Sequence, residues 1–160
     1  MKASRPPAAL QIRRRAWRDL VAELGVRGRG NRESGAFLLG HRRSRRPRVT
    51  RVVYFDDLEP DSLNGAVHLT HIAYSRLWEL CRAIGLEVLG DVHTHPGSIV
   101  SQSHIDQDNP LVAQVGHVAL IVPHYAQGSI AAADVGVYEY QGDEGWSTRP
   151  SASVHRRWFW

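Results

Sequence analysis

The sequence has few of the features on which secreted and membrane proteins depend. It contains one cysteine, Cys81, which excludes an internal disulfide. No apolar run approaches the roughly 20 residues of a membrane-spanning helix, and no apolar stretch follows the positive charges near the N-terminus as in a secretory signal. Hydrophobic residues make up 42% of the 160 residues and charged residues 22%, values typical of a folded globular chain. We therefore expect a soluble protein in the cytoplasm.

Positive charge is concentrated in the first third of the chain. Residues 1–51 hold fifteen of the twenty Lys and Arg residues but three acidic residues, whereas residues 52–160 hold thirteen acidic residues. The densest stretch, HRRSRRPR (41–48), is compatible with nucleic-acid binding or with an acidic partner protein. No helix-turn-helix, aromatic RNA-binding signature or Cys/His finger accompanies it. We favour a solvated basic turn and expect no nucleic-acid partner.

Hydrophobic periodicity predicts a mixed α/β domain. Apolar side chains recur at helical spacing over residues 11–24 and 71–85, with Thr70 as the N-cap of the second helix and Gly85 at its end. A shorter helix is expected over residues 104–115. Apolar and β-branched runs predict strands at 35–40, 49–55, 66–69, 86–93, 117–123, 133–140 and 145–150.

These elements fill most of the chain and indicate one domain. We expect residues 10–150 to form an α/β/α sandwich with a mixed central sheet and flanking helices, in which residues 56–65 are a polar loop. Residues 1–9 contain paired prolines and little to bury, so they predict a flexible N-terminal tail. Residues 151–160 end in RRWFW and predict a basic and aromatic C-terminal tail.

The segment from His93 to Asp106 carries the residues with the clearest chemistry. His93 and His95 lie two residues apart on an extended segment, so both imidazoles point to the same side. Ten residues separate His95 from Asp106, which is expected one turn into the next helix. Two nitrogens and one oxygen, with a fourth position open, are typical of catalytic rather than structural zinc. A structural alternative remains for the second half, because Ser103 and Asp106 have the S-x-x-D pattern of a helix capping box.

Together with Glu33 in ESGAFLLG (33–40), the HTHP sequence (93–96) and S-x-x-D resemble the JAMM motif of the JAB/MPN metalloprotease family. The order of predicted elements up to about residue 140 also resembles that family's layout, a cytidine-deaminase-like fold. The resemblance implies a zinc metallopeptidase in which His93, His95 and Asp106 bind one Zn²⁺. It further implies that Glu33 is the general base and that Ser103 donates a hydrogen bond to the oxyanion. Other divalent ions also accept two histidines and a carboxylate.

Three alternatives to a peptidase follow from the same residues. A zinc deaminase needs a P-C-x-x-C sequence, which a single cysteine excludes. An inactive scaffold of the family typically lacks ligands, whereas all five expected residues stand here. A DNA-repair-associated member would explain the basic N-terminal third, but the helix-hairpin-helix extension of that branch has no counterpart in this sequence.

The remaining titratable residues have simpler interpretations. We take Glu87 and Asp91 as solvated carboxylates at the end of a strand, although either could orient an imidazole. Cys81 lies on the apolar face of its helix and is expected in the core. Five further histidines lack an evident partner in the sequence: His68, His71, His104, His117 and His124.

The compact size resembles stand-alone prokaryotic members of the family. Our hypothesis is a deubiquitinase-like isopeptidase that releases a ubiquitin-like protein from its conjugates or trims its C-terminus. Its gene would lie in a bacterial operon with the activating and conjugating enzymes, as in some antiphage (antiviral) defence systems, and these enzymes would be further partners. The extended tail of the substrate would add as a strand near the site. The alternative is processing of a sulphur-carrier protein in cysteine or cofactor biosynthesis.

Overall fold

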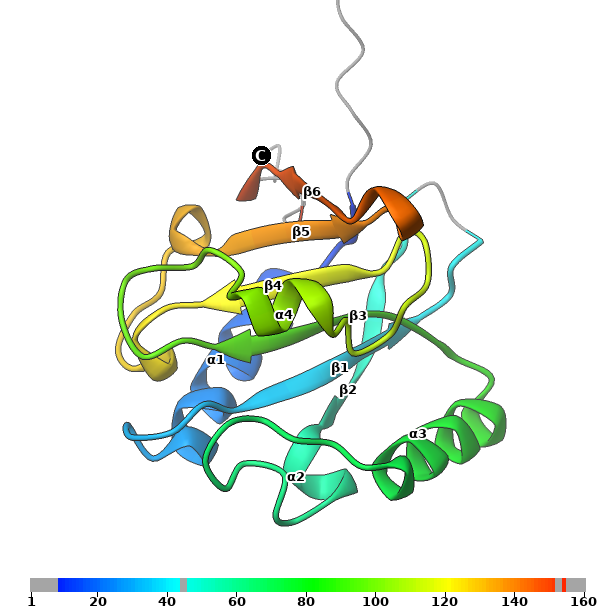
Figure 1. Cartoon of the computed structure of the whole chain (residues 1–160), viewed down its shortest axis with the longest axis horizontal. Helices are drawn as coiled ribbons and strands as arrows, with labels where there is room; N and C mark the ends of the chain where they lie inside the picture. The colour runs from blue at the N-terminus through cyan, green and yellow to red at the C-terminus, as the bar shows by residue number, and fades with distance from the viewer. Residues whose placement is uncertain (1–8, 44–45, 152–153, 155–160) are drawn as a thin grey trace, which may run out of the picture.

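A six-stranded mixed sheet forms the centre of the protein in the computed structural model, which describes residues 9–43, 46–151 and 154 (Figure 1). The strand order is β2-β1-β3-β4-β5-β6. β3 and β4 are parallel, and the other neighbouring pairs are antiparallel. The strands are β1 (Gly35–Gly40), β2 (Val49–Tyr54), β3 (Glu87–Thr94), β4 (Val118–Val122), β5 (Gly136–Tyr140) and β6 (Trp146–Arg149).

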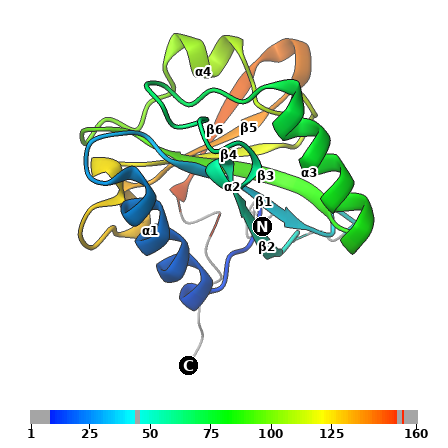
Figure 2. The same ribbon diagram turned by 90° about the horizontal axis from the view of Figure 1, so that it is seen from below.

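Helices cover both faces of this sheet, as Figure 2 shows: α1 lies on one side, and α3 and α4 lie on the other. Each face has its own apolar core, one beneath α1 and one beneath α3. The predicted α/β/α sandwich is therefore confirmed. The α-helices are α1 (Arg14–Gly28), α2 (Phe55–Leu58), α3 (His71–Ile84) and α4 (His104–Asp108), and the short 3-10 helices are η1 (His124–Ala126), η2 (Ala132–Asp134) and η3 (Gly142–Glu144).

Helix α3 begins and ends where its sequence predicts. The Thr70 side chain accepts a hydrogen bond from the Ile72 N–H and caps the first turn. Gly85 ends the helix in the left-handed region at a φ of 67°, which costs glycine little. Cys81 is buried on the inner face, as expected. Among the described residues, no helix has the length and apolarity needed to cross a bilayer.

Three local predictions are wrong. Residues 66–69 pair with no strand of the described sheet, although they are apolar enough to do so. The helix expected over 104–115 ends at Asp108, because Pro110 follows and disfavours helical geometry at Asn109. The loop expected over 56–65 contains most of α2, which begins at Phe55.

The structure describes a few residues of both predicted tails, and in the C-terminal one Val154 packs into the domain. Val154 is 1% exposed within the core, and its carbonyl accepts a hydrogen bond from the Ile12 N–H. The tail over 1–9 falls almost wholly outside the described residues, as does RRWFW. The proposed domain boundaries stay predictions.

Candidate metal centre

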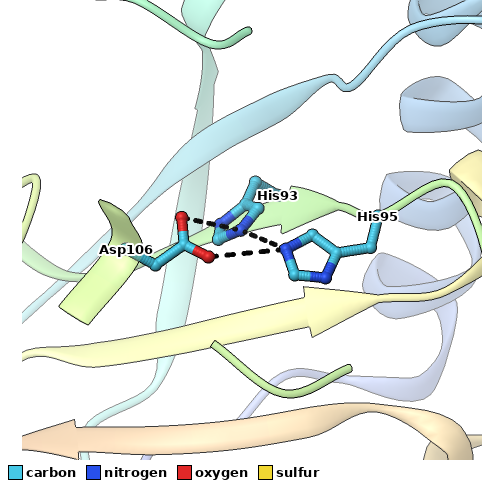
Figure 3. Close-up of side chains that lie close together, drawn as sticks. All are labelled: His93, His95 and Asp106. Carbon is cyan, nitrogen blue, oxygen red and sulfur yellow. Dashed lines mark hydrogen bonds and ion pairs between the residues drawn. The ribbon is translucent and has the colours of Figure 1, made fainter. Parts of the chain in front are cut away.

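Strand β3 carries His93 near its C-terminal end and delivers His95 one residue beyond it. Their side chains turn to the face covered by α4, where the two Nε2 atoms lie 3.2 Å apart (Figure 3). β3 is a central strand between β1 and β4, and His93 is accordingly 8% exposed. The two imidazoles therefore point to the same side, as their spacing on an extended segment predicts.

Asp106 approaches the two histidines from the first turn of α4. Its Oδ1 lies 3.6 Å from His93 Nε2, and its Oδ2 lies 3.5 Å from His95 Nε2. The predicted capping box is present as well: the Ser103 N–H donates to Asp106 Oδ2 at 2.8 Å, and the Asp106 N–H donates to Ser103 Oγ at 3.1 Å. The helix start and the ligand cluster thus use the same carboxylate and do not exclude each other.

The spacing of these three side chains fits a small tetrahedral ion. Ligand atoms about 2.0–2.1 Å from a tetrahedral zinc lie roughly 3.4 Å from one another. The two Nε2 atoms are 3.2 Å apart, and each lies 3.5 or 3.6 Å from a different oxygen of the Asp106 carboxylate. Within the part of the chain that the structure describes, no other group of His, Cys, Asp or Glu has such an arrangement. Three donors leave one tetrahedral position for water or substrate, which matches catalytic rather than structural sites.

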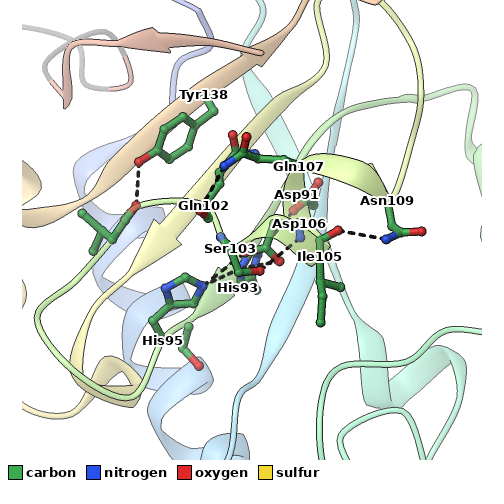
Figure 4. A network of polar contacts seen from close by, with 12 residues as sticks. Asp91, His93, His95, Gln102, Ser103, Ile105, Asp106, Gln107, Asn109 and Tyr138 are labelled. Carbon is green, nitrogen blue, oxygen red and sulfur yellow. Dashed lines mark hydrogen bonds and ion pairs between the residues drawn. The ribbon is translucent and has the colours of Figure 1, made fainter. Parts of the chain in front are cut away.

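Each imidazole has a polar neighbour on the side away from the cluster. His95 Nδ1 lies 3.1 Å from the Ile99 carbonyl oxygen, so it donates its proton there and keeps Nε2 free as a ligand atom. His93 Nδ1 faces Asp91 Oδ1 at 3.9 Å. Figure 4 shows this network together with Ser103 and the chain that leads into α4.

The cluster also perturbs the protonation of its members. Burial alone would lower the pKa of His93, but the carboxylates of Asp106 and Asp91 outweigh burial and raise the pKa to about 10. Burial would raise the pKa of Asp106, yet its close contacts with the His93 and His95 rings hold the pKa well below its usual range. The metal-free protein therefore holds a protonated His93 against two carboxylates at neutral pH.

This protonation predicts a pH-dependent affinity for zinc. Zinc requires a neutral imidazole, so binding displaces the His93 proton, and we expect the affinity to rise about tenfold per pH unit between about pH 6.5 and 8.5. In the metal-free protein, the raised pKa contributes stability that is fully present below about pH 6.5 and lost as the pH rises through about 10. Competition titrations against a chromophoric chelator at several pH values test the first statement, and a flat profile would contradict it.

Glu33 lies two residues before β1 and lines the same cleft as the three candidate ligands. Two hydrogen bonds hold the segment that carries Glu33 against β3. The Ser34 N–H donates to Thr94 Oγ1 at 3.0 Å, and the Thr94 N–H donates to the Ser34 carbonyl at 2.9 Å. Thr94 stands between the two histidines, so its backbone and side chain tie the Glu33 segment directly to the His-x-His segment.

A left-handed turn supports the loop after His95. His124, Tyr125 and Ala126 have φ values of 58°, 51° and 57° and are separated from β4 by Pro123. Such a conformation costs roughly 1–2 kcal/mol per non-glycine residue. The Tyr125 N–H donates to the His95 carbonyl at 2.8 Å, and the His124 N–H donates to the Gly97 carbonyl at 3.0 Å. The strained turn thus fastens the loop that carries His95.

The burial of Asp91 and the pairing of His117 differ from the predictions made from the sequence. Asp91 is 3% exposed rather than solvated, and His117 has a partner, because its Nε2 lies 2.6 Å from Asp91 Oδ2. Asp91 shares the period-two alternation of His93, which is the one signal that could have indicated it. Glu87 is exposed at the other end of β3, as predicted, where it accepts a hydrogen bond from the Arg42 N–H.

The candidate ligands and Glu33 line a cleft of about 670 Å³ that extends well beyond them. The segment 66–69 forms part of its wall, together with Tyr74 from α3. Other lining residues follow α4 or belong to β6: Asn109, Pro110, Leu111 and Trp146. The cleft combines a polar end at the histidines with apolar walls, as binding sites for a substrate commonly do.

Comparison with known proteins finds a matching family and a similar protein. A family model described as prokaryotic homologs of the JAB domain matches residues 7–135. Over 72 residues the chain is 31% identical to a protein named "Probable metalloprotease y4jG" from Sinorhizobium fredii (strain NBRC 101917 / NGR234). That alignment covers 45% of this chain and 44% of the relative, so it spans less than half of the relative's length.

Solved structures agree in fold. Protein DSY2949 from Desulfitobacterium hafniense superposes with a TM-score of 0.64 at 17% identity, over 88% of this chain and 90% of that one. A protein from Salinibacter ruber (strain DSM 13855) gives a TM-score of 0.63 at 17% identity, over 92% and 91% of the two chains. The family model covers most of the sequence, and its range includes Glu33 and all three candidate ligands. This chain belongs to the family of prokaryotic homologs of the JAB domain.

Proposed function

We propose that the protein is a zinc-dependent peptidase whose substrate is a ubiquitin-like protein or its conjugates. The observation that carries this proposal is the close approach of His93 Nε2, His95 Nε2 and the Asp106 carboxylate, at 3.2–3.6 Å, with Glu33 lining the same cleft. The name of the Sinorhizobium relative agrees with such chemistry. Three protein ligands beside one free carboxylate are what metal-assisted hydrolysis of an amide requires.

Each residue then has a defined task. When bound, zinc lowers the pKa of water towards neutrality and polarises the scissile carbonyl. Glu33 accepts the proton of the attacking water and passes it to the departing amine. The Ser103 hydroxyl oxygen already accepts from the Asp106 N–H, which leaves its own O–H free to donate to the oxyanion. The start of α4 keeps this donor in place.

The cleft offers room for an extended peptide beside these residues. Segment 66–69 runs along it without pairing to the sheet. An extended tail can add to such a segment through main-chain hydrogen bonds while its side chains contact the apolar walls. Ubiquitin-like proteins end in a tail of this kind. We propose that the protein acts on them in the cytoplasm, alongside the activating and conjugating enzymes of the same operon.

Cleavage assays test this proposal directly. The substrates are a ubiquitin-like protein fused through its C-terminal tail to a reporter, and the same protein joined to a lysine side chain. We expect cleavage that stops with a zinc chelator and returns when zinc is restored, because the hydrolytic step needs the ion. Release of a short C-terminal peptide alone would favour sulphur-carrier processing. Activity that survives complete removal of the metal would overturn the proposal.

A further inference from the structure

A second histidine–aspartate pair lies in the core directly behind the candidate ligands. His117 is 0% exposed and Asp91 is 3% exposed, and His117 Nε2 donates to Asp91 Oδ2 at 2.6 Å. The other oxygen of Asp91 faces His93 Nδ1 at 3.9 Å. One buried carboxylate therefore stands between a candidate zinc ligand and an imidazole that has no direct contact with the cluster.

The parallel pairing of β3 and β4 produces this alignment. Asp91 is paired with Ala119, so His117, two residues earlier on the neighbouring chain, projects from the same face as Asp91. Period-two alternation puts His93 on that face too. The strands approach closely here, since a Cβ on Gly90 would lie 2.2 Å from the Val118 carbonyl oxygen. The spacing between the two side chains is thus set by the backbone.

Stability alone does not account for the pair. Removing a carboxylate and an imidazole from water costs several kcal/mol, and apolar residues of similar volume are often as stable or more so. The pair also leaves His117 Nδ1 without a hydrogen-bond partner among the described residues. Buried polar groups kept at such a cost are commonly used to fix a neighbouring functional group.

We infer that Asp91 is a positioning residue for the zinc ligand His93 and that His117 holds Asp91 in place. His93 directs Nε2 towards His95 and Asp106, so its ring proton belongs on Nδ1, where Asp91 is the carboxylate in front of it. A proton acceptor at this position fixes the tautomer and makes the ligand nitrogen more basic. With Asp106, it also supplies two negative charges against the two positive charges of Zn²⁺. This inference rests on the zinc site of the proposed function.

Zinc affinity, measured by competition with a chromophoric chelator, tests the role without relying on peptidase activity. We expect Asp91→Asn to weaken zinc binding about 10- to 100-fold and to alter the visible absorption of the Co²⁺-substituted protein. His117→Leu removes the hydrogen bond that fixes Asp91 and should weaken binding in the same direction. His117→Gln can still donate an N–H to Asp91 and should restore most of the affinity.

A matched control separates positioning from simple destabilisation. Val118 is 1% exposed and adjoins His117, but it belongs to the opposite core beneath α1. Val118→Ala should lower the melting temperature and leave zinc affinity within about twofold. Wild-type affinity and an unchanged Co²⁺ spectrum in Asp91→Asn would overturn the inference while the zinc site stands. If Asp91→Asn does not fold, equal affinities of His117→Leu and His117→Gln overturn it. Absence of zinc binding by the parent protein would overturn both proposals.

Discussion

Glu33→Gln should lower kcat/KM for cleavage by about 10²- to 10⁴-fold, the usual contribution of a general base, and still bind one zinc ion per chain. Glutamine keeps the size of the side chain but cannot accept the proton of the attacking water. Glu33 does not belong to the group of three residues that could hold a metal ion, so its replacement should leave the metal in place. Steady-state cleavage of the fusion substrate and metal content after dialysis measure the two effects.

The control for this variant is Glu79→Gln, which removes the same charge from the exposed face of α3. It should cleave at the parent rate. Two results would contradict the assignment of Glu33. Parent-like cleavage by Glu33→Gln would exclude a role as the base, and loss of zinc from that variant would make Glu33 a ligand instead.

Gly35→Ala should be the most damaging change for the fold near the site. A Cβ at this position would lie 2.3 Å from Phe55 Cε2 and 2.6 Å from the Val92 carbonyl oxygen. The ring could shift only into a packed core, and the carbonyl belongs to the backbone of β3. Moving either group would therefore destabilise the fold. We expect a loss of about 1–3 kcal/mol in the free energy of unfolding, as in other overpacked cores. Urea unfolding measures it.

Gly97→Ala is the matched control, because a Cβ there meets no atom within 4 Å. Its free energy of unfolding should stay within about 0.5 kcal/mol of the parent value. An equally small change in Gly35→Ala would mean that β1 and β3 are farther apart than the structure shows. Since Gly35 stands two residues after Glu33 and is paired with His93, the same variant should also lose catalytic activity.

The candidate ligands could be predicted because their geometry is largely local. An extended backbone alone places the side chains of His93 and His95 on one side. The first turn of a helix places Asp106, and Ser103 marks the start of that helix as its N-cap. The Asp91–His117 pair could not be predicted in the same way. It depends on β3 and β4 being parallel neighbours in one particular register, which no spacing within either segment indicates.

The same distinction explains the errors in secondary structure. Residues 66–69 have the composition of a strand, but a strand also requires a hydrogen-bonded partner, and this segment pairs with none of the six described strands. Phe55 ends a β-branched run and was expected in that strand, yet it begins α2 because its ring packs edge-on against Phe37 in the core. Tertiary packing decided both cases.

The capping box around Asp106 bears on which cations the cluster selects. Asp106 Oδ2 is engaged by the Ser103 N–H, so the carboxylate can offer a cation one oxygen without giving up the start of α4. Calcium takes about six to eight oxygen ligands, often with carboxylates bound through both oxygens, and magnesium demands an octahedral oxygen shell. A carboxylate restricted to monodentate binding beside two imidazoles favours ions of low coordination number. If the cluster binds a cation as proposed, the N-terminus of the five-residue helix α4 would favour such ions over calcium or magnesium.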